Sequence, residues 1–165
     1  MAINPNPFGT HDKNLLNFFV SGTPRPKQSF RVIKKGRGKV QGYADPKMAA
    51  WQDYVSLRAK TEVNHFKERH GISYDATGLY SVRLIFGLPD RRVRDLDNLS
   101  KGTLDGMRHI VFDDDKQVKL LSLAAMPVPK GEEGVYISVG VILDVWFYGL
   151  WNAPRPKGFI KEIGK

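Results

Sequence analysis

The stretch Arg91-Arg92-Val93-Arg94-Asp95-Leu96-Asp97-Asn98-Leu99-Ser100-Lys101 stands where a predicted strand gives way to a predicted helix. Residues 79–88 before it alternate between large apolar and small or polar side chains, which predicts a strand with one buried face. Residues 98–110 after it repeat apolar side chains at helical spacing, and Asp97 occupies the position expected of an N-cap. The stretch therefore joins a strand to a helix and carries an unusual density of charge.

Composition narrows the classes of protein to which the chain can belong. Its 165 residues fit one domain with a core of moderate size. The absence of cysteine excludes disulfides, thiolate zinc sites and a cysteine nucleophile. A formal charge of +9 favours a polyanionic partner, which is nucleic acid or, less often, an anionic membrane surface. Residues 1–10 do not resemble a signal peptide and no apolar run reaches membrane-spanning length, so we expect a cytoplasmic protein with no membrane partner.

The remaining apolar patterns predict an α+β fold. Asp45 and Pro46 begin a helix that Gly71 ends, and its aromatic residues belong to the core, while His65 and His70 lie on the surface. Further strands are predicted over residues 17–21, 30–33, 39–43, 117–125 and 135–145. We expect a single domain, residues 17–145, in which two main helices pack on a mixed β-sheet. A flexible N-terminal arm, residues 1–16, precedes it, and a basic C-terminal extension, residues 146–165, follows.

Basic residues concentrate in a patch near the N-terminus and in the arginine run before Asp95. The patch comprises a proline-rich loop over residues 22–27 and a glycine-containing hairpin turn near residue 37, which lie close together in the sequence. Such a patch either is solvated or contacts phosphates, and its density favours phosphate contact. The candidate DNA-binding residues are Arg25, Lys27, Arg31, Lys34, Lys35, Arg37, Lys39, Arg91, Arg92 and Arg94.

The acidic residues form a pattern of their own within this basic chain. Asp95 and Asp97 face the same way if Leu96 is extended, and Asp97 shares a helical face with Lys101. Asp113, Asp114 and Asp115 follow the predicted helix, and we expect the chain to return and bring one or two of them to the same place. Taken singly, these residues are explained as an N-cap, its helical neighbour and a solvated turn. Taken together, they predict a metal site.

Clustered carboxylates repel one another unless a cation is present, and Mg²⁺ prefers oxygen ligands and also binds phosphate. Such an ion activates water and neutralises charge on a phosphodiester, while Lys101 adds positive charge. A calcium-binding EF-hand loop that began at Asp95 would need a ligand at Leu99, a glycine at Ser100 and a glutamate at Gly106. A hard divalent cation beside a polyanion is therefore the favoured interpretation.

Several motifs resemble the RusA-type Holliday junction resolvases. The central one is Arg-Asp-Leu-Asp-Asn-Leu-x-Lys at 94–101, followed by Leu-Asp at 104–105 and Asp-Asp-x-Gln-Val at 114–118. Gly-x-Pro-x-Pro-Lys at 22–27 and Tyr-x-Asp-Pro-Lys at 43–47 occur in the same order. The resemblance spans residues 18–145.

This resemblance implies a homodimeric endodeoxyribonuclease of phage or prophage character, in a bacterial host cell. It implies dependence on Mg²⁺, with Mn²⁺ as a substitute, and paired symmetric nicks in four-way DNA junctions. By the same resemblance the catalytic residues are Asp95, Asp97, Lys101 and Asp115. The metal ligands are the three aspartates together with Asp114, and counting back from Gln117 selects Asp115 over Asp114 as the essential distal acid. Two alternatives stay open: another metal-dependent nuclease acting on flaps, forks or mismatched duplex, and a non-catalytic binder of branched DNA.

Overall fold

The computed structural model describes residues 14–27, 31–35, 39–43, 45–89 and 95–142. For residue 14 and residues 31–35 and 39–43 it describes the backbone only. The predicted arm before residue 14, the tip of the hairpin at residues 36–38, the arginine run at residues 91–94 and the predicted C-terminal extension lie outside the described residues.

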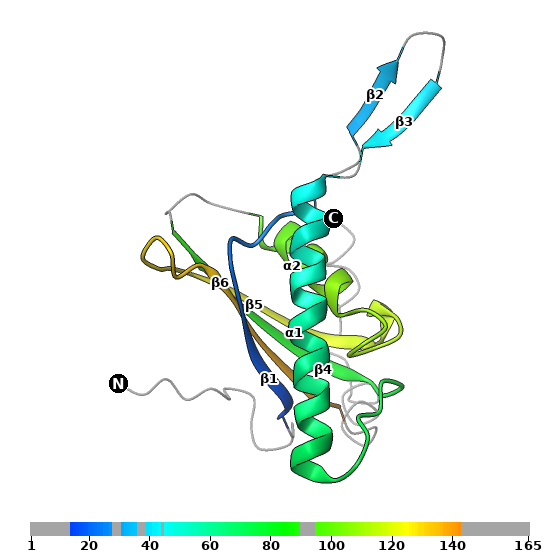
Figure 1. The fold of residues 1–165 in the computed structure, drawn as a ribbon, viewed down its shortest axis with the longest axis vertical. Helices are drawn as coiled ribbons and strands as arrows, with labels where there is room; N and C mark the ends of the chain where they lie inside the picture. The colour runs from blue at the N-terminus through cyan, green and yellow to red at the C-terminus, as the bar shows by residue number, and fades with distance from the viewer. Residues whose placement is uncertain (1–13, 28–30, 36–38, 44, 90–94, 143–165) are drawn as a thin grey trace, which may run out of the picture.

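A four-stranded mixed sheet forms the centre of the domain (Figure 1). Its order is β1 (Asn14–Ser21), β6 (Gly134–Val141), β4 (Tyr80–Leu88) and β5 (Val118–Pro127). β6 pairs antiparallel with both β1 and β4, whereas β4 and β5 pair in parallel. Among the described strands, β5 therefore lies at one edge of the sheet. Strands β2 (Arg31–Lys35) and β3 (Lys39–Tyr43) form a separate hairpin, which projects beyond the start of the first helix (Figure 1).

Helix α1 (Pro46–His70) has the two ends that its sequence predicts. The Asp45 carboxylate accepts a hydrogen bond from the Lys47 N–H at the N-terminus, where Pro46 opens the first turn. Gly71 ends the helix with φ of 68°, a left-handed conformation that glycine adopts without steric cost. The inward face buries Trp51, Val55, Ala59 and Phe66.

Helix α2 (Leu96–Met107) follows β4 and lies beside α1 on the same face of the sheet (Figure 1). The two helices approach closely because glycines face α1. A Cβ atom on Gly106 would lie 2.8 Å from the Val55 Cβ atom and 2.9 Å from the Gln52 carbonyl oxygen. The glycines that lower the helix propensity of α2 are thus the residues that allow its packing.

The core lies between the two helices and the sheet. Val82, Leu84 and Phe86 alternate along β4 toward the helices, and Val135, Ile137 and Val139 do the same along β6. These observations confirm the predicted single-domain α+β fold with two main helices on a mixed sheet. None of the helices in the described part of the chain is both long and apolar enough to cross a membrane.

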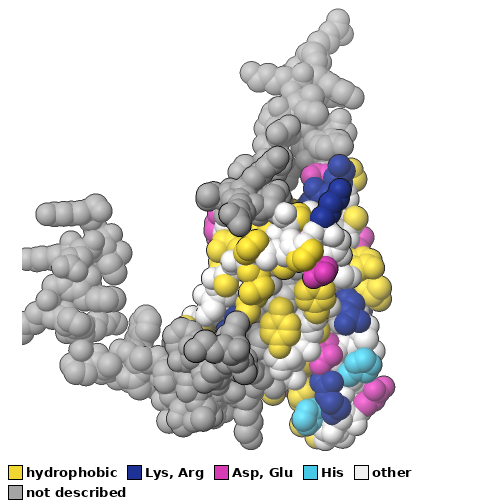
Figure 2. Space-filling view, turned by 90° about the vertical axis from the view of Figure 1, so that its left-hand side faces the viewer, with side chains coloured by type: hydrophobic (Ala, Val, Ile, Leu, Met, Phe, Trp, Pro, Cys, Tyr) yellow, Lys and Arg dark blue, Asp and Glu magenta, His cyan; other side chains and the backbone are white. Residues whose placement is uncertain are grey.

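Two details differ from the sequence-based expectations. The N-cap of α2 is Asp95 and not Asp97, because the helix begins at Leu96. The register of β5 against β4 shifts between Val118 and Leu120, where Tyr80 and Ser81 stand opposite, and not at Leu120-Leu121. Seen from the left-hand side of Figure 1, exposed hydrophobic side chains gather on the middle of the surface and Lys and Arg side chains lie toward one edge (Figure 2).

Candidate active site and nucleic-acid interface

Asp95 is held rigidly by the start of α2. One of its carboxylate oxygens accepts hydrogen bonds from the backbone N–H groups of Asp97 and Asn98, at 3.0 and 3.3 Å. The other accepts from the side-chain amide of Asn98 at 2.6 Å. A negative charge at this position is also favoured by the helix dipole. Asp95 therefore presents an exposed, preorganised carboxylate at the tip of the helix.

Asp97 lies in the first turn and pairs with Lys101 one turn later. The Lys101 ammonium donates to the Asp97 carboxylate at 2.5 Å, and both side chains are more than half exposed. This hydrogen bond, together with the negative charge of Asp97 and the weaker influence of Asp95, raises the pKa of Lys101. Lys101 thus stays a cation throughout the neutral range, next to two carboxylates, as the sequence predicts.

The proline-rich loop lies directly against α2. The Lys27 N–H donates to the Asn98 carbonyl at 2.9 Å, and a Cβ atom on Gly102 would lie 2.9 Å from the Arg25 carbonyl oxygen. The Lys27 ammonium also pairs with Asp105 at 2.6 Å. Gly102 therefore lets the basic loop approach the helix that carries Asp95, Asp97 and Lys101.

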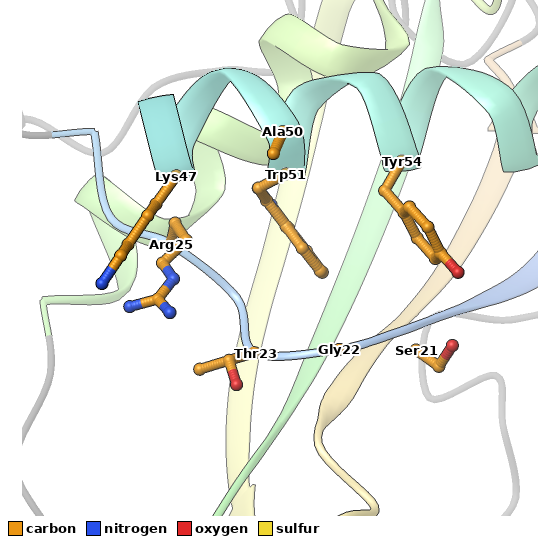
Figure 3. Close-up of a pocket in the computed structure, with 8 residues that line it drawn as sticks. All are labelled: Ser21, Gly22, Thr23, Arg25, Lys47, Ala50, Trp51 and Tyr54. Carbon is orange, nitrogen blue, oxygen red and sulfur yellow. The ribbon is translucent and has the colours of Figure 1, made fainter. Parts of the chain in front are cut away.

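A hollow opens where this loop meets the first turns of α1 (Figure 3). Its lining combines two cationic side chains with hydroxyl groups and aromatic rings: Ser21, Gly22, Thr23, Arg25, Lys47, Ala50, Trp51 and Tyr54. Cations with hydroxyl donors are the groups that contact phosphate oxygens of DNA.

Sequence reasoning identified only Arg25 among these lining residues as a DNA contact. Trp51 is buried, as expected of a core aromatic, but Tyr54 is 51% exposed. Its position about two helical turns after Lys47, beyond the Tyr-x-Asp-Pro-Lys motif, was the available signal. The fold was needed to show that this side of α1 faces the loop.

The distal aspartates occupy the turn that precedes β5. Asp114 caps a short 3₁₀ helix, η1 (Asp115–Gln117), through the Lys116 N–H, and this hydrogen bond is the main cause that lowers the pKa of Asp114. Arg108 lies 3.5 Å from the same carboxylate. Gln117 fixes the turn: its amide oxygen accepts from the N–H groups of Asp113 and Asp114, and its amide nitrogen donates to Ala76 and Gly78.

The expected convergence of these aspartates with Asp95 and Asp97 does not occur within the described residues of one chain. No group of three acidic or histidine side chains that could hold a metal ion is found there. The chain does return along β5, but Asp113–Asp115 precede that strand and remain at the far end of α2. One chain therefore brings Asp95, Asp97 and Lys101 together without a distal acid.

Most of the other residues predicted to contact DNA have side chains that lie outside the described part of the structure. The side chains of Arg31, Lys34, Lys35 and Lys39 belong to the β2–β3 hairpin, of which the structure describes the backbone only. Arg37, Arg91, Arg92 and Arg94 lie outside the described residues.

Comparison with known proteins places the site in a family. The family model described as "Endodeoxyribonuclease RusA" matches residues 21–140, which is most of the chain and includes the proline-rich loop, both helices and β5. The chain belongs to the RusA family of endodeoxyribonucleases. The Asp95–Asp97–Lys101 group and the Asp114–Gln117 turn both lie inside the region that matches the RusA model.

RusA proteins from distant sources resemble the chain over most of its length. It is 28% identical to a protein named "Crossover junction endodeoxyribonuclease RusA" from Aquifex aeolicus, over 75% of this chain and 90% of the relative. It is 30% identical to a protein of the same name from Escherichia coli K12, over 70% of this chain and 89% of the relative. A relative from Enterobacteria phage 82, with the corresponding name, matches with the same identity and coverage.

For a divalent cation, one chain of this RusA-family member offers two neighbouring carboxylates, Asp95 and Asp97. Mg²⁺ is commonly held by one or two carboxylates together with waters and substrate phosphates. The two aspartates fit that role, because both are exposed and at least one is preorganised. The sequence predicts a larger set of carboxylate ligands, and within the described residues no third acidic side chain joins Asp95 and Asp97. That larger set therefore requires a further carboxylate from elsewhere.

Proposed function

We propose that this chain is a Mg²⁺-dependent endodeoxyribonuclease that resolves four-way DNA junctions by paired symmetric nicks, with Mn²⁺ as a substitute. The observation that carries the proposal is the Asp95–Asp97–Lys101 group at the tip of α2, beside a basic loop, in a chain of the RusA family. The names of the relatives, which describe crossover junction endodeoxyribonucleases, support the same substrate.

Within this proposal Asp95 and Asp97 hold the metal ion, and Asp115, with Asp114 beside it, supplies the distal carboxylate. When bound, the ion would supply an activated water and neutralise charge on the phosphodiester. Asp95 is oriented by its three hydrogen bonds, so it contributes a fixed ligand direction. Lys101 is protonated, because its pKa is raised. Its ammonium group supplies positive charge toward the phosphate or the leaving oxygen.

The junction arms are held by the basic residues on the same side of α2. Arg25 and Lys47 in the hollow of Figure 3 contact phosphates. Lys27 and, as predicted from the sequence, the basic residues at 31–39 and the arginines before Asp95 supply further phosphate contacts. Because Lys27 is already paired with Asp105, we expect it to position the loop as well as to attract DNA.

The protein works as a homodimer in this proposal, since two symmetric cuts require two equivalent sites. We place it in the cytoplasm of a bacterial host cell, encoded by a phage or prophage. The domain of residues 17–145 carries the activity.

A panel of branched DNA substrates tests the proposed substrate. Four-way junctions, flaps, replication forks, mismatched duplex and linear duplex are compared at equal concentration with Mg²⁺. We expect preferred cutting of the four-way junction. Preferred cutting of flaps or forks would favour a different structure-specific nuclease, and binding of junctions without cutting under any divalent cation would favour a non-catalytic binder.

A further inference from the structure

The hollow between the proline-rich loop and α1 carries two cations that have no carboxylate partner. Within the described residues neither Arg25 nor Lys47 forms an ion pair, whereas Lys27 on the same loop is paired with Asp105. The lining adds serine and threonine hydroxyl groups beside these cations. Unpaired cations together with hydroxyl donors suit a phosphate group. One end of the hollow is therefore able to bind an anion.

The other end of the hollow is formed by an aromatic ring that is open to solvent. Figure 3 shows Arg25 and Lys47 at one end and Tyr54 at the other. Tyr54 is 51% exposed, and it follows Lys47 on α1 at a distance of about 10 Å along the helix axis. Exposed aromatic rings stack on nucleic-acid bases of any sequence, because every base has a π-face. The hollow thus combines a stacking ring with a site for phosphate.

The size of the hollow and a buried donor in its wall both indicate a small polar ligand. Its volume is about 380 Å³, near the lower end of the range of about 300–1,000 Å³ for small-ligand sites. Trp51, in the wall, is 5% exposed, and its indole N–H is the one buried side-chain polar atom in the described ranges that lacks a hydrogen-bond partner. Buried donors in folded proteins are normally paired. This observation is independent of the charges at the other end.

A ring in such a hollow stacks only on a base that has left the double helix. In a continuous duplex the faces of each base are covered by its neighbours, so Tyr54 has no face to contact. Unstacking costs least where base pairing is already interrupted, as at a branch point or an unpaired nucleotide. Phosphates, by contrast, are the same in branched and linear DNA. The two ends of the hollow therefore read different features of the nucleic acid.

We propose that this hollow binds one unstacked nucleotide of branched DNA, with the base on the Tyr54 ring and a neighbouring phosphate at Arg25 and Lys47. Tyr54 contributes selectivity for interrupted duplexes, and the two cations contribute affinity for any DNA. The branch point as the source of the nucleotide rests on the proposed function, whereas the binding of an unstacked nucleotide does not.

Two substitutions of Tyr54 separate the ring from its hydroxyl group. Binding is measured by fluorescence anisotropy, without divalent cations, to a linear duplex and to the same duplex with one unpaired thymidine. We expect Tyr54→Leu to weaken binding of the interrupted duplex about tenfold, because the stacked base loses its ring. Its affinity for the linear duplex should not change. Tyr54→Phe keeps the ring and should bind both duplexes as the wild-type protein does.

The control is Tyr136→Leu, which removes a 39% exposed tyrosine from β6 and should leave both affinities unchanged. Circular dichroism of each variant checks that the fold is retained. An equal loss of affinity for both duplexes in Tyr54→Leu, or no loss for either, would overturn the proposal. The same loss in Tyr54→Phe as in Tyr54→Leu would assign the effect to the hydroxyl group and would rule out stacking.

Photo-cross-linking locates the unstacked base. Iododeoxyuridine replaces the unpaired thymidine, and irradiation of the complex links this base to an aromatic ring in contact with it. Mass spectrometry should identify Tyr54 as the linked residue, and the same analogue paired within the duplex should give no link to Tyr54. Bound DNA that links only to residues outside the hollow, or to none, would contradict the site.

These measurements separate the two proposals. If the wild-type protein cuts no DNA while Tyr54→Leu loses affinity for the interrupted duplex alone, the proposed function fails and the nucleotide site stands. If the wild-type protein cuts four-way junctions while Tyr54→Leu binds the interrupted duplex and cuts junctions as the wild-type protein does, the proposed function stands and the nucleotide site fails.

Discussion

At the scale of single residues, the pair of Asp97 and Lys101 is the most specific feature of the site. The carboxylate raises the pKa of Lys101, so the paired cation persists below its raised pKa and is lost as the pH rises through it. We expect Asp97→Asn to lower the pKa of Lys101 toward the ordinary lysine value of about 10.4. An NMR titration of the Lys101 side chain measures this change. Asp53→Asn, which removes an exposed carboxylate on α1, is the control and should leave the pKa of Lys101 unchanged. The same Lys101 pKa in wild type and in Asp97→Asn would contradict the pairing.

At the same scale, Gly106 sets the distance between the helices. A methyl group there meets the Val55 side chain and the Gln52 backbone. Overpacking costs about 1–3 kcal/mol, whereas the better helix propensity of alanine returns about 1 kcal/mol. We therefore expect Gly106→Ala to lower the free energy of unfolding by up to about 2 kcal/mol in urea denaturation. Lys60→Ala, at an exposed position on α1, should change it little, and a stabilised Gly106→Ala protein would mean that the helices lie farther apart.

At the scale of elements, the turn before β5 depends on one side chain. Gln117 accepts two backbone N–H bonds and donates to two carbonyls, so it joins η1 to the segment before β4. We expect Gln117→Met to destabilise the fold by about 1–3 kcal/mol, because four backbone groups, three of them in partly buried contacts, lose their hydrogen-bond partner. Thermal unfolding measures the loss, and Lys130→Met in the exposed β5–β6 loop is the control. Equal melting temperatures for Gln117→Met and wild type would show that the turn is held by other contacts.

Sequence patterns predicted the elements better than they predicted the site. Asp45, Pro46 and Gly71 have strong local preferences, so both ends of α1 could be predicted before the fold was known. The start of α2 was misplaced because Asp95 and Asp97 are equally good caps, and hydrogen-bond geometry decides between them. The position of Asp115 depends on the relative directions of α2 and β5 in the fold. The spacing of residues in the sequence does not determine those directions. Lys47 and Tyr54 face Arg25 only because the loop lies against α1.

At the scale of the whole molecule, the charge of +9 predicts how junction binding responds to salt. Binding of about six or more phosphates should weaken roughly 1,000-fold between 50 and 200 mM salt, because counterions are released. Lys47→Ala should reduce the slope by about one contact. Lys67→Ala is a matched control, since it lies about 30 Å along α1 from Lys47. Fluorescence anisotropy with the Asp97→Asn protein measures these slopes, and affinity that is unchanged over this range would rule out the phosphate-binding surface.

The most direct test of the proposed active site is the position of the cuts in an end-labelled four-way junction. Wild-type protein with Mg²⁺ is predicted to nick two opposing strands at symmetric positions, and a chelator is predicted to stop it. Asp97→Asn is predicted to bind the same junction without nicking it. Nicking by Asp97→Asn, or cuts by the wild-type protein that survive the chelator, would contradict the assignment of the metal-dependent site to the start of α2.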